Sequence, residues 1–124
     1  MVLKYHNIKT VVDGITFDSK LELNRYCYLK LLERAGELKS VVYHKKYVLQ
    51  ESFINSRGKH RAGITYTPDF IIMKKDGTIY AEDVKGNKTI ITDLFSVKQK
   101  LFEKRYPDIE LKIITSKNRR WIEL

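Results

Sequence analysis

The chain has 124 residues, 43% of them hydrophobic, which is enough for one substantial core and too few for two. Lys and Arg number 24 against 15 Asp and Glu, so the formal net charge is +9. This excess indicates a polyanionic partner, most simply nucleic acid, although a basic protein without such a partner is the alternative. The single cysteine excludes a disulfide framework and a cysteine-based zinc site.

The first elements predicted along the chain are a hairpin and a helix. Residues 10–17 (TVVDGITF) place two short runs of β-formers around Asp13-Gly14, which predicts a small hairpin with a two-residue turn. The following helix has Asp18 or Ser19 as its cap and ends at Gly36. Its expected apolar face consists of four residues: Leu21, Tyr28, Leu29 and Leu32.

The rest of the chain predicts four strands and a second helix. Residues 40–50, 64–73 and 78–85 are expected to be strands, with residues 52–63 as a long polar loop. The second helix is expected to begin at Thr92 or Asp93 and to stop before Pro107, with Leu94, Val97 and Leu101 at helical spacing. Residues 109–115 are expected to form the last strand. After the hairpin the order is α-β-β-β-α-β, which predicts an α/β (α+β) fold with a mixed sheet flanked by helices.

Charged residues stand in the predicted strands 64–73 and 78–85, against their β-propensity. A two-residue loop, Asp76-Gly77, would turn Asp83 away from Asp69. A three-residue loop over residues 75–77, with Gly77 left-handed in a G1 bulge, sets Asp69 opposite Asp83 with Lys85 on the same face. We prefer this second register, because three apolar residues then share the core-facing side: Phe70, Ile72 and Val84.

Facing carboxylates repel each other unless a cation lies between them. Mg²⁺ suits Asp69 and Asp83, because it takes oxygen ligands from one or two carboxylates, water and phosphate, and we expect Mn²⁺ to substitute. A lysine beside the metal, Lys85, can position or deprotonate a water. The simpler alternative is a surface hairpin in which Lys85 forms an ordinary salt bridge. Glu82 points to the other face and is not assigned to the metal.

Pro68-Asp69 followed by Asp83-Val84-Lys85 resembles the motif of the PD-(D/E)XK nuclease superfamily. This resemblance implies a restriction-endonuclease-like α-β-β-β-α-β core, forming a single nuclease domain over residues 1–124, and an Mg²⁺-dependent DNA endonuclease. In that enzyme Asp69, Asp83 and the Val84 carbonyl bind the metal, and Lys85 is the catalytic lysine.

The resemblance also assigns roles to residues on both helices. The superfamily often adds a helical glutamate to the metal site, and Glu22 matches it, although Ser19 and Glu22 also fit a capping box in which Glu22 reaches back to a backbone N–H. A basic or amide residue is expected on the second helix. Lys98 is the better match and Gln99 the less certain one, with a solvated helix face as the alternative.

Four segments together resemble a small family of phage-encoded nucleases, some of which are regarded as Holliday-junction resolvases: YHNIKTVVDGITFDSKLELNRY, YTPDF, EDVKG and KQKLF. Branched DNA in recombination or DNA processing is then the expected substrate. A homodimer is implied, because symmetric cutting of two strands needs two sites. His44 stands where many relatives have Gln. Flap, nicked or linear duplex DNA remains an alternative substrate, and an inert DNA-binding module is an alternative function.

Basic residues concentrate in residues 57–61, 98–105 and 116–121, which suit contacts to DNA phosphates. The residues assigned to this role are Arg57, Lys59, Arg61, Lys98, Lys100, Arg119 and Arg120. Tyr5 and Trp121 are candidates for stacking on exposed bases, and Trp121 equally for packing against the fold or a second subunit. The three histidines, His6, His44 and His60, are scattered and are expected to be surface or DNA-facing side chains rather than ligands.

Other partners are not indicated by the sequence. No apolar run approaches the roughly 18 residues of a membrane-spanning helix, and residues 1–10 lack the apolar core of a signal peptide. No P-loop or dinucleotide fingerprint is present, so we expect no nucleotide cofactor. The expected location is the cytoplasm, that of the host cell if the protein is phage-encoded.

Overall fold

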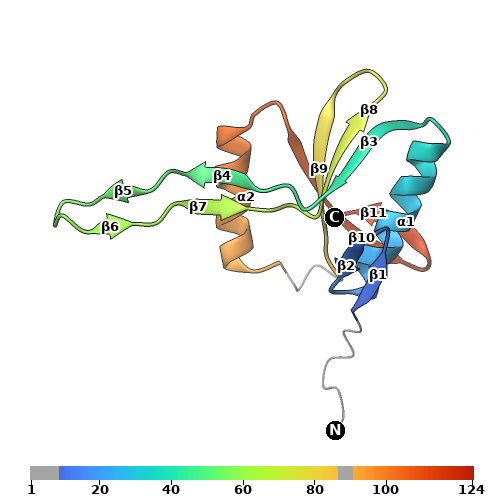
Figure 1. Cartoon of the computed structure of the whole chain (residues 1–124), viewed down its shortest axis with the longest axis horizontal. Helices are drawn as coiled ribbons and strands as arrows, with labels where there is room; N and C mark the ends of the chain where they lie inside the picture. The colour runs from blue at the N-terminus through green and yellow to red at the C-terminus, as the bar shows by residue number, and fades with distance from the viewer. Residues whose placement is uncertain (1–8, 87–90) are drawn as a thin grey trace, which may run out of the picture.

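A computed structural model describes residues 9–86 and 91–124, and its central feature is a five-stranded mixed sheet in the order β11-β10-β9-β8-β3 (Figure 1). Strands β9 and β10 are parallel, and the other neighbours are antiparallel. The elements in chain order are β1 (Thr10–Val12), β2 (Ile15–Phe17), α1 (Lys20–Arg34), β3 (Leu38–Tyr43), β4 (Tyr47–Gln50), β5 (Phe53–Ile54), β6 (His60–Arg61), β7 (Ile64–Tyr66), β8 (Phe70–Lys74), β9 (Ile79–Val84), α2 (Asp93–Arg105), β10 (Glu110–Lys117) and β11 (Arg120–Glu123).

The two helices cover opposite faces of this sheet. Because side chains alternate along a strand, Phe70 and Ile72 pack with Leu29 of α1, whereas Ile71 packs with Phe102 of α2. Each of these aromatic and aliphatic clusters is buried, and both faces of β8 are therefore apolar. The predicted mixed sheet flanked by helices, with the order α-β-β-β-α-β after a small hairpin, is confirmed.

The predicted helix boundaries are confirmed, but the predicted apolar faces are partly wrong. Ser19 caps α1, and Thr92 caps α2. On α1 the buried residues are Arg25, Tyr26 and Leu29, whereas Tyr28 is 42% exposed. On α2 the buried residues are Phe95 and Phe102, whereas Leu94 and Val97 are exposed. A helix of this length has several apolar stripes, and the sheet that it meets decides which one is buried.

Two predicted strands are each divided in the structure. Residues 40–50 form β3 and β4, separated at His44, whose φ is +59°. Residues 64–73 form β7 and β8, separated at residues 67–69. The inner halves, β3 and β8, pair in the central sheet, while β4 pairs with β7 in a separate ribbon. The predicted loop 52–63 continues this ribbon as β5 and β6. Strand β11 was not predicted.

The loop between β8 and β9 has the preferred three-residue form. Lys74 donates its backbone N–H to Thr78 O at 2.8 Å, and Gly77 is left-handed with φ +89°. Phe70 lies opposite Glu82 in the register that follows from this loop, and one step further along it Asp69 lies opposite Asp83. The predicted register of the hairpin is therefore confirmed.

Candidate functional site

Two buried carboxylates lie at one end of the β8–β9 hairpin. Asp69 directly precedes β8, and Asp83 is the next-to-last residue of β9. Only 8% of Asp69 and 6% of Asp83 is exposed. The backbone N–H of Val84 donates to Asp69 Oδ2 at 2.7 Å, which fixes this carboxylate against the end of β9. Carboxylates are rarely buried without partners, so this end of the sheet is the candidate site.

Asp83 is held by two side chains from other parts of the site. The Tyr66 hydroxyl donates a short hydrogen bond to Asp83 Oδ2. Lys85 Nζ lies 3.2 Å from Asp83 Oδ1 and 4.3 Å from the centre of the Phe95 ring. Burial and the neighbouring Asp83 raise the pKa of Tyr66 above its ordinary value, so this hydroxyl remains a donor. The predicted neighbourhood of Asp83 and Lys85 is confirmed.

The backbone of Glu22 takes part in the helix cap, whereas its carboxylate takes part in the site. The Ser19 hydroxyl accepts a hydrogen bond from the Glu22 backbone N–H at 3.1 Å, as in half of a capping box. The Glu22 carboxylate instead accepts a hydrogen bond from the Tyr43 hydroxyl at 2.8 Å. Its side chain therefore points from the start of α1 toward the end of β3, beside Asp69.

His44 completes a group that the sequence interpretation missed. Its Nε2 atom lies 3.6 Å from Asp69 Oδ1 and 3.9 Å from Glu22 Oε2, and its ring stacks on Tyr43 with the ring centres 3.6 Å apart. One ligand atom from each of Glu22, His44 and Asp69 lies within 4.8 Å of the others. His44 is exposed, as predicted for the histidines, but it also lies in a group that could hold a metal ion. Asp83 is not in this group.

The charges of the group are only partly compensated. The pKa of Asp69 is raised to about 7, mainly by burial and also by the carboxylates of Asp83 and Glu22, against the hydrogen bonds from His44 and Val84, which lower it. The hydrogen bond to Asp69 in turn raises the pKa of His44, against the effect of burial. A bound cation would relieve the same repulsion that raises the pKa of Asp69.

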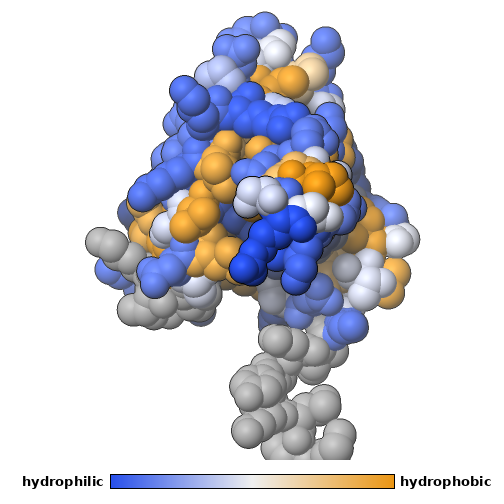
Figure 2. Space-filling view, turned by 90° about the vertical axis from the view of Figure 1, so that its left-hand side faces the viewer, coloured by the Kyte–Doolittle hydropathy of each residue, from blue (hydrophilic) through white to orange (hydrophobic). Residues whose placement is uncertain are grey.

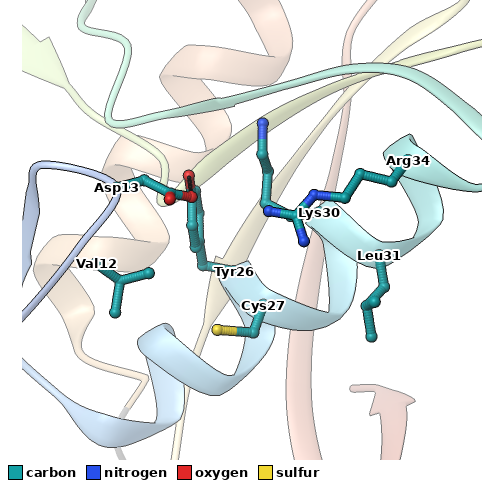
Figure 3. Close-up of a pocket in the computed structure, with 7 residues that line it drawn as sticks. All are labelled: Val12, Asp13, Tyr26, Cys27, Lys30, Leu31 and Arg34. Carbon is teal, nitrogen blue, oxygen red and sulfur yellow. Dashed lines mark hydrogen bonds between the residues drawn. The ribbon is translucent and has the colours of Figure 1, made fainter.

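A hollow of about 430 Å³ opens beside these carboxylates. Its walls include Asp69, Asp83 and Lys85 from the hairpin, and Lys98 from α2. Lys98 therefore lies beside the same hollow as Asp69 and Asp83, and its role there stays a prediction. A second hollow of about 320 Å³ lies between α1 and the N-terminal hairpin, beside Tyr26 and Lys30, and contains none of the predicted site residues (Figure 3).

The other predicted DNA-binding residues are exposed but lie on separate elements. Three of them (Arg57, Lys59 and Arg61) are on the β5–β6 ribbon, Lys100 is on α2, and two (Arg119 and Arg120) are at the β10–β11 turn. Strands β9 and β10 are parallel, so this turn lies beyond the same end of the sheet as Lys85. Figure 2 shows hydrophilic residues interspersed with hydrophobic patches on the side toward which the ribbon projects.

The remaining sequence interpretations concern residues outside this cluster. Trp121 packs against the fold, where the Arg25 guanidinium lies 5.0 Å from its ring centre. Tyr5 and His6 lie outside the described residues. Glu82 points to the face opposite Asp83, as predicted, and is paired with Arg25. None of the described helices is long and apolar enough to cross a membrane.

Asp69→Asn is expected to stabilise the metal-free protein at high pH. The pKa of Asp69 in the fold, about 7, is above its ordinary value of 3.8, so its contribution to stability is complete below about pH 4 and is lost as the pH rises through 7. Asn mimics the protonated form. We expect the free energy of unfolding of the variant in EDTA to match wild type near pH 4 and to exceed it at pH 8 by on the order of 1 to 4 kcal/mol.

Urea unfolding at both pH values measures this difference, with the exposed Asp108→Asn as the control that should change neither curve. Added Mn²⁺ or Mg²⁺ should stabilise wild type at pH 8 more than the variant, because the metal relieves the same repulsion. A variant that is less stable than wild type at pH 8 would contradict the assigned electrostatics.

The fold and the site together define a mixed α/β sandwich with a buried carboxylate cluster at one end of its sheet. The chain belongs to a family described as a protein of unknown function (DUF1064), which it matches over residues 2–120. No curated protein matches the chain.

Proposed function

We propose that the protein is a metal-dependent endonuclease that hydrolyses phosphodiester bonds in branched DNA, with the four-way junction as the leading substrate. One observation carries this proposal. Asp69 lies opposite Asp83, which is paired with Lys85, and its carboxylate also groups with Glu22 and His44. The hollow beside Asp69 and Asp83 is lined by a second lysine, Lys98. This combination provides metal ligands and phosphate-binding cations in the same place.

The residues present fit a divalent cation. Asp69 shares the site with Asp83 on one side and with Glu22 and His44 on the other, so the donors are carboxylate oxygens and one imidazole nitrogen. Mg²⁺ prefers oxygen donors, whereas imidazole suits transition metals, so His44 favours Mn²⁺ beside Mg²⁺ as the cofactor. When bound, such a metal acidifies a water and neutralises charge on the phosphate.

The protein's own groups supply the remaining functions. Lys85 lies beside Asp83 and is positioned to orient or deprotonate the attacking water, or to offset negative charge on the phosphate. Tyr66 keeps the Asp83 carboxylate oriented. Lys98 lines the hollow from α2 and can contact the phosphate there. A homodimer would present two such sites to the paired strands of a junction.

The net charge of +9 also supports a second candidate, a DNA-binding module without catalysis. A substrate panel separates the two. Four-way junction, flap, fork, nicked and linear duplex DNAs with a common sequence are incubated with protein and Mg²⁺ or Mn²⁺, and Asp83→Asn serves as the inactive control. We expect paired cuts in the junction and little cutting of linear duplex. Comparable cutting of linear duplex would overturn the preference for branches. Binding without any cleavage would favour the module.

A further inference from the structure

A two-stranded ribbon, residues 47–66, projects away from the central sheet and is here called the arm (Figure 1). Its base is the β4–β7 pair, and its distal part is the β5–β6 pair. The base is well packed, since Tyr47, Leu49 and Tyr66 belong to the core cluster around α2. The arm therefore has a fixed base and an exposed distal part.

The base of the arm is directly connected to the candidate site. At the end of β7, Tyr66 donates a hydrogen bond to Asp83. At the start of the arm, β4 begins three residues after His44. From α2, the Tyr106 hydroxyl donates to Val48 O at 2.8 Å, and Arg105 forms an ion pair with Glu51 at 2.9 Å. These contacts fix the direction of the arm relative to the carboxylates.

The distal part of the arm combines apolar and basic side chains. Phe53 is 46% exposed and Ile54 is 63% exposed, so the fold gains little from burying either of them. Three basic residues, Arg57, Lys59 and Arg61, are exposed around them, and the single acidic residue of the arm, Glu51, is paired at the base. The distal parts of two arms would repel each other, because both are basic, whereas a polyanion would be attracted to them. DNA is thus the occupant that the charges favour.

We propose that the arm lies in the major groove of a duplex segment beside the cleaved position, with Arg57, Lys59 and Arg61 on phosphates and Phe53 and Ile54 against base edges. The major groove admits a two-stranded β-ribbon. This inference rests on the proposed function and adds to it a requirement on the substrate. Lys59 lies seven residues from Tyr66, which at a rise of ~3.3 Å per residue corresponds to ~23 Å. Such a reach covers about seven base pairs at roughly 3.4 Å each.

The test measures binding rather than cleavage, in an Asp83→Asn background without divalent metal. Junctions with duplex arms of 4, 7, 10 and 14 base pairs are titrated by fluorescence anisotropy. For this parent protein we expect the affinity to fall about tenfold or more when the arms are shortened below seven base pairs. The triple variant Arg57→Ala, Lys59→Ala, Arg61→Ala should bind junctions of all arm lengths equally weakly. The slope of its log affinity against log salt concentration should fall by the amount that corresponds to up to about three phosphate contacts.

Two further variants complete the comparison. Phe53→Ser with Ile54→Ser should weaken binding severalfold without changing the salt dependence, because these side chains carry no charge. The matched control removes three exposed basic residues elsewhere, Arg34→Ala, Lys39→Ala and Lys75→Ala, and should keep the length dependence of the parent. Thermal unfolding should be similar for all variants, because the altered side chains are exposed.

The outcomes separate the arm from the nuclease. An arm variant that keeps the affinity and the length dependence of the parent overturns the role of the arm, even where wild type cleaves junctions. If the parent shows the length dependence but wild type cleaves no DNA with either metal, the arm proposal stands and the nuclease proposal fails. Conversion of a dimer to a monomer by the triple arm variant in sedimentation would show that the arm is a subunit interface, which also overturns the proposal.

Discussion

Asp83→Asn is expected to lower the rate of DNA cleavage by at least about 100-fold while leaving the fold and DNA binding intact. Loss of a residue that only orients a metal ligand typically lowers metal affinity or activity by 10- to 100-fold, and loss of a proposed ligand such as Asp83 should lower activity at least as much. Asp83 is 6% exposed and accepts a hydrogen bond from Tyr66, which Asn can still accept through its amide oxygen. The substitution therefore removes charge with little change in shape.

Three companion variants assign the roles around Asp83. Lys85→Ala should also abolish most cleavage, because Lys85 is the cation beside Asp83. Tyr66→Phe should give an intermediate loss of roughly 10- to 100-fold, because only the orientation of Asp83 is lost. The exposed Asp108→Asn should cleave like wild type. Initial rates on a junction substrate at several Mn²⁺ concentrations measure all four. Unchanged cleavage in both Asp83→Asn and Lys85→Ala would show that the site is elsewhere.

The hairpin that carries the site could be predicted from the sequence because its turn is a local feature. Gly77 is the residue that tolerates φ +89°, and this conformation sets the three-residue loop, the register and the opposition of Asp69 and Asp83. The helix boundaries were likewise predictable, since the cap residues Ser19 and Thr92 act within four residues of their own positions. Local chemistry thus determined the parts that the sequence predicted correctly.

The missed parts depend on contacts between distant segments. Residues 40–50 look like one strand, but β3 pairs with β8 while β4 pairs with β7, and no residue in the segment itself marks the change of partner. His44 lies at this break, in a left-handed conformation that is uncommon for a residue other than glycine. His44, Glu22 and Asp69 come from three distant segments of the chain, so no spacing pattern within the sequence could show that they lie together.

The second large effect is expected at Arg25→Met, on the opposite face of β9 from Asp83. The Arg25 guanidinium donates two hydrogen bonds to the Glu82 carboxylate, at 2.7 and 2.6 Å, and the two residues are 7% and 1% exposed. Removing one partner of a buried pair leaves an uncompensated charge, which typically costs about 3 to 5 kcal/mol. Urea unfolding should show a loss of this size. Lys30→Met, which breaks a half-buried pair with Glu33 on the same helix, should cost less than about 1 kcal/mol.

The double variant Arg25→Met, Glu82→Leu distinguishes the cost of an unpaired charge from the worth of the pair itself. If burial of the charges is the dominant cost, apolar side chains of similar size should restore most of the lost stability.

The Arg25–Glu82 pair also affects the register of β9, because Glu82 and Asp83 are adjacent acidic residues on opposite faces of this strand. Arg25 holds Glu82 on the α1 face, so a one-residue slip that would bring Glu82 to the hollow also breaks this pair. A stable double variant with reduced cleavage would therefore indicate that the pair sets the register of the site, whereas recovery of both properties would limit its role to charge compensation.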